Sequence, residues 1–200
     1  MDCEGLFYRV AYKKGIIDKE TLTTLRLFYI EYTKNSFNPY EYFIYQLCII
    51  KKFNLNVRKN FISFLIKSII KVNVNKIIFS KLISRSNVIV STSSISFISS
   101  IVVKALIHKS YLICTNANNI NIGYDFINYS YSKVSNLMAL LKKNYPKDYI
   151  IEFFTDSIND LPLLLKSNIR WIVNPSCYFL GKTTLLENRV VLFSKRTVLI

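Results

Sequence analysis

Short runs rich in β-branched and aromatic residues alternate with helical stretches through the second half of the chain. These runs cover residues 87–90, 111–114, 149–154, 170–173 and 190–193. Helical stretches lie between most of them, near residues 95–107, 132–144 and 159–167. Strands that alternate with helices predict an α/β fold with a parallel sheet and crossover helices. In such a sheet the functional site lies beyond the carboxyl ends of the strands, so the residues that follow each run are the first candidates.

The first 80 or so residues are instead predicted to be helical. Asp18 is a plausible N-cap for a helix that begins near it, and Pro39 suits a first helical turn. Further helices are predicted at 41–53, 57–72 and 76–84. The aromatic stripe of the second helix is interpreted as packing rather than a ligand site; it comprises Tyr40, Tyr42, Phe43 and Tyr45. We therefore divide the chain into a helical region, 1–84, and an α/β core, 85–200.

Composition narrows the possible partners. The chain has 200 residues, a net charge of +15 and 51% hydrophobic residues, which predicts one globular domain or a small domain with an insertion. The charge fits either a nucleic-acid-binding protein or lysines accumulated on a solvated surface through an A/T-rich genome. The lysines are scattered, and neither an arginine-rich block nor a zinc-ligand array accompanies them. We favour the second interpretation and expect no nucleic-acid partner.

Two further features bear on the compartment. None of the four cysteines forms a C-x-x-C pair, so we expect reduced, mostly buried thiols in a cytoplasmic protein. The segment 86–103 carries no charge but holds eight hydroxyl side chains, which makes it a poor membrane span. A buried strand followed by a helix explains it better.

Two aspartates follow the third run. Asp156 and Asp160 stand four residues apart, at a predicted strand end and helix start, with Asn159 beside them. Such carboxylates suit a magnesium ion that keeps some of its waters. The same spacing also fits a helix N-cap with an acid in the first turn.

Hydroxyl and lysine side chains follow other elements. Ser91 and Thr92 open the serine-rich stretch 91–94 after the first run, where hydroxyls and backbone amides at a helix start could cradle a phosphate. A serine-rich turn that caps the next helix is an equal alternative. Lys133 opens a later helix, where its ammonium could neutralise a phosphate and a carboxylate.

Taken in order, Ser91, Lys133 and the segment 155–164 resemble haloacid dehalogenase (HAD) phosphatases of the phosphoserine-phosphatase-like branch. Residues 173–175 fit the tail of that pattern, and 15–18 and 29–42 look like the helical cap of small hydrolases in this branch, some of which act on histidinol phosphate. The resemblance implies a Rossmann-like parallel sheet with an amino-terminal helical cap insertion. Thr155 stands where many relatives have glycine.

The resemblance also implies roles. An aspartate attacks phosphorus to form a phospho-aspartate, and a second acid protonates the leaving group. Ser91, with Thr92, would bind the phosphoryl group, and Lys133 would balance charge. Asp156 would ligate Mg²⁺, with Asp160 in support. The expected substrate is a small phosphorylated metabolite, histidinol phosphate ahead of phosphoserine, as in amino-acid biosynthesis.

The nucleophile motif is the weak point of this match. Its candidates are Asp2 as nucleophile and Glu4 as acid/base, and only Met1 precedes them. A nucleophile of this family ends a buried strand of about five residues, so the first central strand is expected to be missing, through a misplaced start or a loss. A degenerate but working motif is the alternative. A decayed HAD scaffold that binds polyanions is the competing function.

Overall fold

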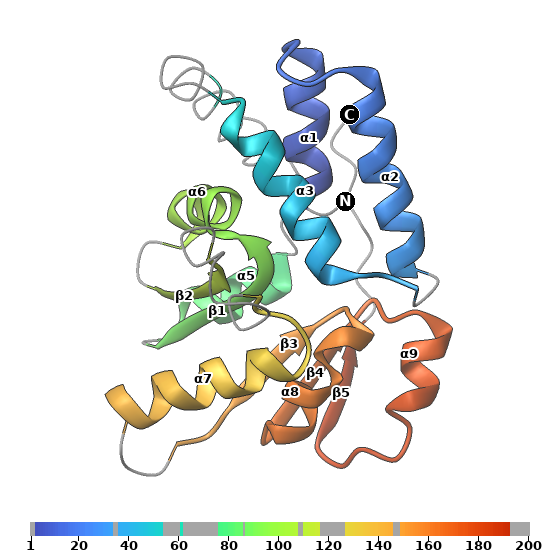
Figure 1. Ribbon diagram of the computed structural model, residues 1–200. Helices are drawn as coiled ribbons and strands as arrows, with labels where there is room; N and C mark the ends of the chain where they lie inside the picture. Colours follow the sequence, from blue (N-terminus) through green and yellow to red (C-terminus); the bar gives the residue numbers. More distant parts are fainter. Residues whose placement is uncertain are drawn as a thin grey trace.

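Helices make up the first part of the chain and alternate with strands in the second (Figure 1). The computed structural model describes residues 3–33, 36–53, 61, 76–85, 87–107, 110–116, 127–145 and 149–192. The first part contains α1 (Cys3–Lys13), α2 (Lys19–Thr33), α3 (Pro39–Lys51) and α5 (Lys76–Ile83). The second contains β1 (Val88–Ile95), α6 (Ser96–Leu106), β2 (Ser110–Thr115), α7 (Tyr131–Asn144), β3 (Glu152–Thr155), η2 (Ile158–Asp160), α8 (Leu161–Lys166), β4 (Ile169–Val173), α9 (Cys177–Lys182) and β5 (Arg189–Leu192). The predicted α/β class is confirmed.

The predicted helix starts are present. Asp18 Oδ1 accepts a hydrogen bond of 2.7 Å from the Thr21 amide, which satisfies an orphan donor at the start of α2. The Asn38 side chain accepts the amides of Tyr40 and Glu41, and Pro39 occupies the first turn of α3. The helix predicted at 57–72 lies, apart from Phe61, outside the described residues.

One apolar cluster joins the helical region to the core. Phe7 and Phe53 pack in it together with Ile95 and Ile98, which lie beyond the boundary at residues 84 and 85. The aromatic stripe of α3 belongs to this packing. Phe43 is 1% exposed, and its neighbours Tyr40, Tyr42 and Tyr45 are partly buried against the cluster. The two regions therefore share a hydrophobic core. In Figure 1, α1–α3 stand together above the second part of the chain, with α3 toward α6 and the end of α2 toward α9.

The strands form two parallel sheets. β1 pairs with β2, and β3, β4 and β5 pair in that order. Within the described ranges no strand stands between β1 and β3. Helix α7 packs on both sheets, because its Leu137 and Leu141 share a cluster with Ile89 of β1 and Phe153 of β3. The parallel pairing was predicted, whereas its division into two sheets was not.

Polar contacts also join the sheets. Arg85, just before β1, forms a 2.8 Å ion pair with Glu152 of β3. At the end of α7, the Tyr145 hydroxyl donates to Asn87 Oδ1 at 3.0 Å. The two sheets are thus held by side chains and by α7.

The serine-rich stretch 91–94 corrects one expectation. It does not form a turn at a helix start, since β1 runs through it to Ile95, with a register shift between Ser91 and Ile95. Helix α6 has Ile95 at its N-cap position and no side-chain cap there. The β-branched Thr92 and the pairing with β2 favour an extended backbone, so the hydroxyls line a strand end.

The cysteines correct a second expectation from the sequence. They were expected to be mostly buried, yet Cys48 and Cys177 are exposed, and Cys114 is partly buried. Cys48 falls outside the face of α3 that buries Phe43, Leu47 and Ile50. Cys177 is the first residue of α9, next to the exposed Tyr178.

The uncharged segment 86–103 raised the question of a membrane span. No helix in the described part of the chain has the length and apolar character needed to cross a bilayer.

Candidate active site

A buried ion pair lies at the centre of the candidate site. Lys133 Nζ and Asp160 Oδ1 are 2.5 Å apart, and the two residues are 5% and 9% exposed. The second carboxylate oxygen, Asp160 Oδ2, accepts a 2.9 Å hydrogen bond from the hydroxyl of Thr155, at the end of β3. The pair joins the first turn of α7 to the turn after β3. A buried carboxylate needs such partners, because an unpaired charge in the interior is strongly unfavourable.

Thr155 contacts both Asp160 and the backbone of the turn that follows β3. Its Oγ1 accepts the amide of Ser157 at 3.0 Å while it donates to Asp160. Thr155 is 6% exposed. Thr155 therefore fixes both the turn and the orientation of Asp160.

The turn between the aspartates decides between the two interpretations of their spacing. The N-cap of η2 is Ser157, whose side chain accepts the Asn159 amide. Asp160 occupies the N-cap position of α8 without a side-chain cap bond. Asp156 is exposed at the end of β3. Ser157 therefore caps η2, and Asp160 makes no side-chain cap bond to α8.

Ser91 lies in a hydrogen-bonded network around Asn128. Asn128 Nδ2 is 3.1 Å from Ser91 Oγ and 2.9 Å from the carbonyl oxygen of Thr92. Asn136 of α7 donates to Asn128 Oδ1 at 3.1 Å, which fixes the amide orientation. Asn128 Nδ2 also lies 3.1 Å from the Ile113 carbonyl oxygen, so its two protons are shared among three acceptors. Ser91 Oγ can only accept from this nitrogen, which leaves its own proton for a different acceptor. This orientation suits a donor to a phosphate oxygen.

Asn128 is completely buried, and its backbone is held as firmly as its side chain. Its amide donates to Thr115 Oγ1 at 3.1 Å, and the Thr115 hydroxyl donates to the Ser93 carbonyl at 2.7 Å. The network therefore spans the carboxyl ends of β1 and β2, where the register of the strands shifts.

Two tyrosines contact the turn after β3, and sequence reasoning did not find them. The Tyr32 hydroxyl, on α2, lies 2.6 Å from Ser157 Oγ, and the Tyr129 hydroxyl donates to Asn159 Oδ1 at 2.7 Å. Tyr129 follows Asn128 directly, so this segment connects the Ser91 network to the aspartate turn. The chain has 14 tyrosines, and no sequence motif distinguishes these two residues from the rest.

Both tyrosines are held in their neutral forms. Burial is the main cause that raises the pKa of Tyr32, and the negative charges of Asp160 and Asp156 raise it further. Burial, followed by Tyr32 and Asp160, raises the pKa of Tyr129 to about 12. The two hydroxyls thus lie within the electrostatic influence of the aspartates.

The two candidates for the nucleophile motif, Asp2 and Glu4, are not found at the Lys133–Asp160 pair. One lies in the helical region and the other outside the described residues. Glu4 is in the first turn of α1, and its Oε2 accepts a 2.7 Å hydrogen bond from the Tyr42 hydroxyl. Gln46 donates to that same hydroxyl at 2.8 Å. Glu4 therefore takes part in a polar network of the helical region. Asp2 falls outside the described residues.

The donor set can be compared with the needs of magnesium. Mg²⁺ is held by one or two carboxylates, substrate phosphate oxygens and several waters. Within the described ranges, no three His, Cys, Asp or Glu side chains gather into a metal-binding group. Asp156 is exposed, while both oxygens of Asp160 accept from Lys133 and Thr155. The residues fit a largely hydrated Mg²⁺ held by the single carboxylate of Asp156, while Asp160 stays bound to Lys133 and Thr155.

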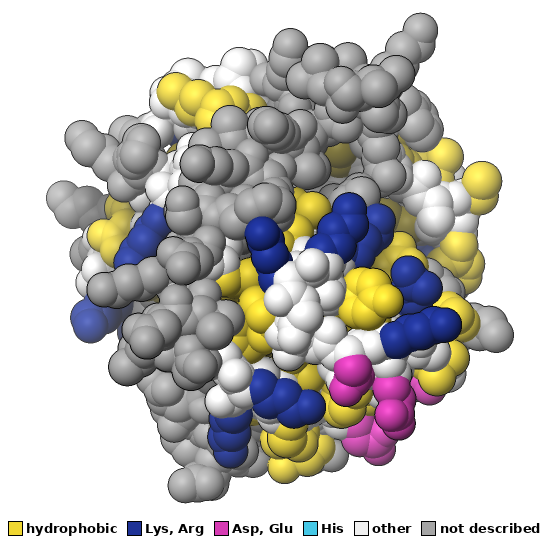
Figure 2. Space-filling view, turned by 90° about the horizontal axis from the view of Figure 1, so that it is seen from above, with side chains coloured by type: hydrophobic (Ala, Val, Ile, Leu, Met, Phe, Trp, Pro, Cys, Tyr) yellow, Lys and Arg dark blue, Asp and Glu magenta, His cyan; other side chains and the backbone are white. Residues whose placement is uncertain are grey.

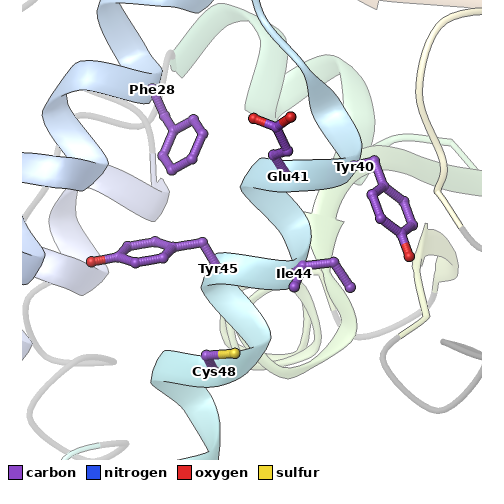
Figure 3. Close-up of a pocket in the computed structure, with 6 residues that line it drawn as sticks. All are labelled: Phe28, Tyr40, Glu41, Ile44, Tyr45 and Cys48. Atoms are coloured by element: carbon purple, nitrogen blue, oxygen red, sulfur yellow. The ribbon is translucent and has the colours of Figure 1, made fainter.

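A separate hollow lies on the helical region (Figure 3). It has a volume of about 280 Å³ and is lined by Phe28 of α2 and by Tyr40, Glu41, Ile44, Tyr45 and Cys48 of α3. Figure 3 shows Phe28 directed toward α3, with Glu41 and Cys48 on the same helix. The hollow is open and mostly apolar, and none of the candidate site residues lines it. The hollow is therefore separate from the candidate site around the Lys133–Asp160 pair.

The structure thus brings Lys133, Asp160 and the exposed Asp156 to one turn and connects Ser91 to them through Asn128 and Tyr129. Comparison of the chain with protein-family models, curated proteins and solved structures finds no match.

Proposed function

We propose that this chain is a magnesium-dependent phosphate-monoester hydrolase of the HAD type that acts on a small phosphorylated metabolite. The observation that carries the proposal is the buried Lys133–Asp160 pair next to the exposed Asp156. Lys133, at 5% exposure, lies against a carboxylate in the turn that follows β3, and the region beyond the carboxyl ends of the strands is where a phosphate site lies in an α/β fold.

The described residues would divide the work as follows. Ser91, oriented by Asn128, donates its proton to a phosphoryl oxygen. The Lys133 ammonium, already paired with Asp160, balances negative charge that accumulates during transfer. Asp156 would hold Mg²⁺, which, when bound, neutralises the phosphate and orients it for in-line attack. The carbonyl oxygen of Thr92 accepts a hydrogen bond from Asn128, and Thr92 would bind the phosphoryl group together with Ser91.

Chemistry of this kind needs an aspartate nucleophile, and Asp2 is its candidate in this chain. In the first step the phosphorus–oxygen bond to the leaving group breaks as a bond to the carboxylate oxygen forms, and the leaving oxygen takes a proton from an acid. Glu4, the acid expected from the sequence, is instead bound to Tyr42 in the helical region, so the leaving oxygen takes this proton from solvent water. In the second step water attacks phosphorus, and inorganic phosphate leaves as the carboxylate is restored. Histidinol phosphate is the preferred substrate, ahead of phosphoserine.

The decisive experiment measures phosphate release from histidinol phosphate, phosphoserine and p-nitrophenyl phosphate, with Mg²⁺ and with a chelator. We expect release that depends on Mg²⁺ and that falls roughly 100-fold or more in Asp156→Asn. Asp18→Asn is the matched control, because it makes the same chemical change at an exposed helix cap. Full activity in Asp156→Asn would show the site assignment to be wrong.

The competing function, polyanion binding, draws on the +15 charge. On the face shown in Figure 2, the described Lys and Arg side chains stand in several separate groups with hydrophobic and uncharged side chains between them. A nucleic-acid interface instead favours a continuous basic surface. This function predicts binding to polyanions that weakens steeply with salt, without turnover.

A further inference from the structure

Two hydroxyls from outside the β3 strand converge on the turn between Asp156 and Asp160. Tyr32 reaches it from the last turn of α2, and Tyr129 from the segment before α7. Tyr32 contacts Ser157 at 2.6 Å, and Tyr129 contacts Asn159 at 2.7 Å. The turn that carries the candidate magnesium ligand is therefore held from two sides by parts of the chain far from it in sequence.

The turn depends on these side chains for its shape. Ser157 Oγ accepts the Asn159 amide at 3.3 Å, so the hydroxyl that contacts Tyr32 also closes η2. Beyond Ser157, the Asp160 amide donates to the Ser157 carbonyl at 3.1 Å. A helix of one 3₁₀ turn has few backbone hydrogen bonds of its own. Side-chain contacts at Ser157 and Asn159 therefore set the relative positions of Asp156 and Asp160.

The two tyrosine rings are placed by a shared neighbour. Phe37 packs against Tyr32 with ring centroids 5.4 Å apart and against Tyr129 with centroids 5.9 Å apart. Ring packing of this kind remains when a tyrosine is replaced by phenylalanine. The hydroxyls can thus be removed one at a time with little change in packing.

We propose that Tyr32 and Tyr129 are positioning residues of the candidate magnesium site, whose hydroxyls hold the Ser157–Asn159 turn so that Asp156 can bind the ion. The inference rests on the proposed function, because it concerns the same site. It makes the affinity for Mg²⁺ depend on α2, a helix of the region expected to act as the cap. Hydrogen-bonding partners of metal ligands change metal affinity by roughly 10- to 100-fold. Tyr32 and Tyr129 contact residues of the turn next to Asp156 rather than Asp156 itself, so we expect an effect at or below the lower end of that range.

The test is calorimetric titration of the full chain with Mg²⁺, without substrate. We expect Tyr32→Phe and Tyr129→Phe each to raise the dissociation constant about five- to tenfold, with melting temperatures close to that of the unsubstituted chain. Tyr29→Phe is the matched control, since Tyr29 lies on the same helix and is 58% exposed. It should leave the dissociation constant unchanged.

A double-mutant cycle separates positioning from general structural damage. If Tyr32 acts through Ser157, adding Tyr32→Phe to Ser157→Ala should produce little further loss of affinity. Additive losses would overturn the proposed route, as would a dissociation constant in Tyr32→Phe equal to that of the unsubstituted chain.

The outcomes distinguish this inference from the proposed function. Loss of binding in Asp156→Asn with unchanged binding in both phenylalanine variants would overturn the positioning role alone. Absence of binding by the unsubstituted chain, or equal binding by Asp156→Asn, would overturn the magnesium site and the positioning role with it.

Discussion

Lys133 and Asp160 form an ion pair between α7 and the turn after β3, with Nζ and Oδ1 2.5 Å apart and both residues largely buried. The two residues are 27 positions apart in the chain, so the pair forms only once α7 has packed on the second sheet. Thr155 satisfies the remaining carboxylate oxygen. The buried charge of Asp160 is therefore compensated by the Lys133 ammonium and by the hydrogen bond from Thr155.

Removing the lysine should destabilise the fold strongly. Lys133→Met leaves the Asp160 carboxylate buried without its cation, and we expect a loss of about 3–5 kcal/mol in the free energy of unfolding. Adding Asp160→Asn should recover part of this loss, because it removes the uncompensated charge. Urea unfolding measures both. Lys104→Met, at an exposed position on α6, is the control, and a loss there as large as in Lys133→Met would refute the argument.

The Ser91 hydroxyl should be needed for phosphate binding. Because Asn128 donates to Ser91, Ser91→Ala removes a proton donor, and we expect inorganic phosphate to inhibit phosphatase activity about tenfold more weakly. Ser100→Ala is the comparison, since the Ser100 hydroxyl bonds only weakly within its own helix at 3.4 Å from the Phe97 carbonyl. Equal inhibition of Ser91→Ala and the unsubstituted chain would exclude Ser91 from the site.

Glu152 should matter more to stability than its ion-pair partner. Arg85 is 56% exposed in its side chain, so Arg85→Ala should cost less than about 1 kcal/mol. Glu152 also accepts a 2.9 Å hydrogen bond from the indole of Trp171. Glu152→Ala removes this second contact and should cost about 1–2 kcal/mol. Thermal unfolding of the two variants compares them directly, and equal losses would contradict the assignment.

The Asp18 cap predicts a dependence on pH. The hydrogen bond from the Thr21 amide is the largest cause that lowers the pKa of Asp18 from its ordinary value of 3.8. A carboxyl whose pKa is lower in the folded chain stabilises the fold above the unfolded value, and this contribution disappears as pH falls through the folded value. Asn caps without titrating, so any stability advantage of the unsubstituted chain over Asp18→Asn should shrink below about pH 4. Urea midpoints across acidic pH test this, and a constant difference would contradict it.

The sequence predicted the elements of this fold better than their assembly. The β-branched runs became parallel strands, and Asp18 and Pro39 marked helix starts, because local propensity and capping depend on nearby residues. The stretch 91–94 was placed at a helix start, as a phosphate cradle or a capping turn, whereas β1 runs through it, since serine fits both a cap and a strand end. Exposure of Cys48 depended on which face of α3 packs, which the residue type alone does not determine.

For the candidate site, the spacing of Asp156 and Asp160 directed attention to the right turn, but their partners came from tertiary structure. Tyr32 and Ser157 are 125 positions apart. Nothing near Tyr32 in the sequence indicates that contact. Asn128 lies in no predicted element, yet it is fully buried and connects Ser91 to α7. Long-range polar contacts of this kind leave no periodic signal, so sequence patterns do not predict them.

The division of the strands into two sheets has a consequence for how the molecule opens. Because no strand pairing joins β1 to β3 in the described part of the chain, each sheet can lose its backbone hydrogen bonds as a separate cooperative unit. Native-state amide exchange should then give different opening free energies for β1–β2 and β3–β5. The amides around Leu137 and Leu141, on the helix packed over both sheets, should exchange as slowly as those of the more stable unit.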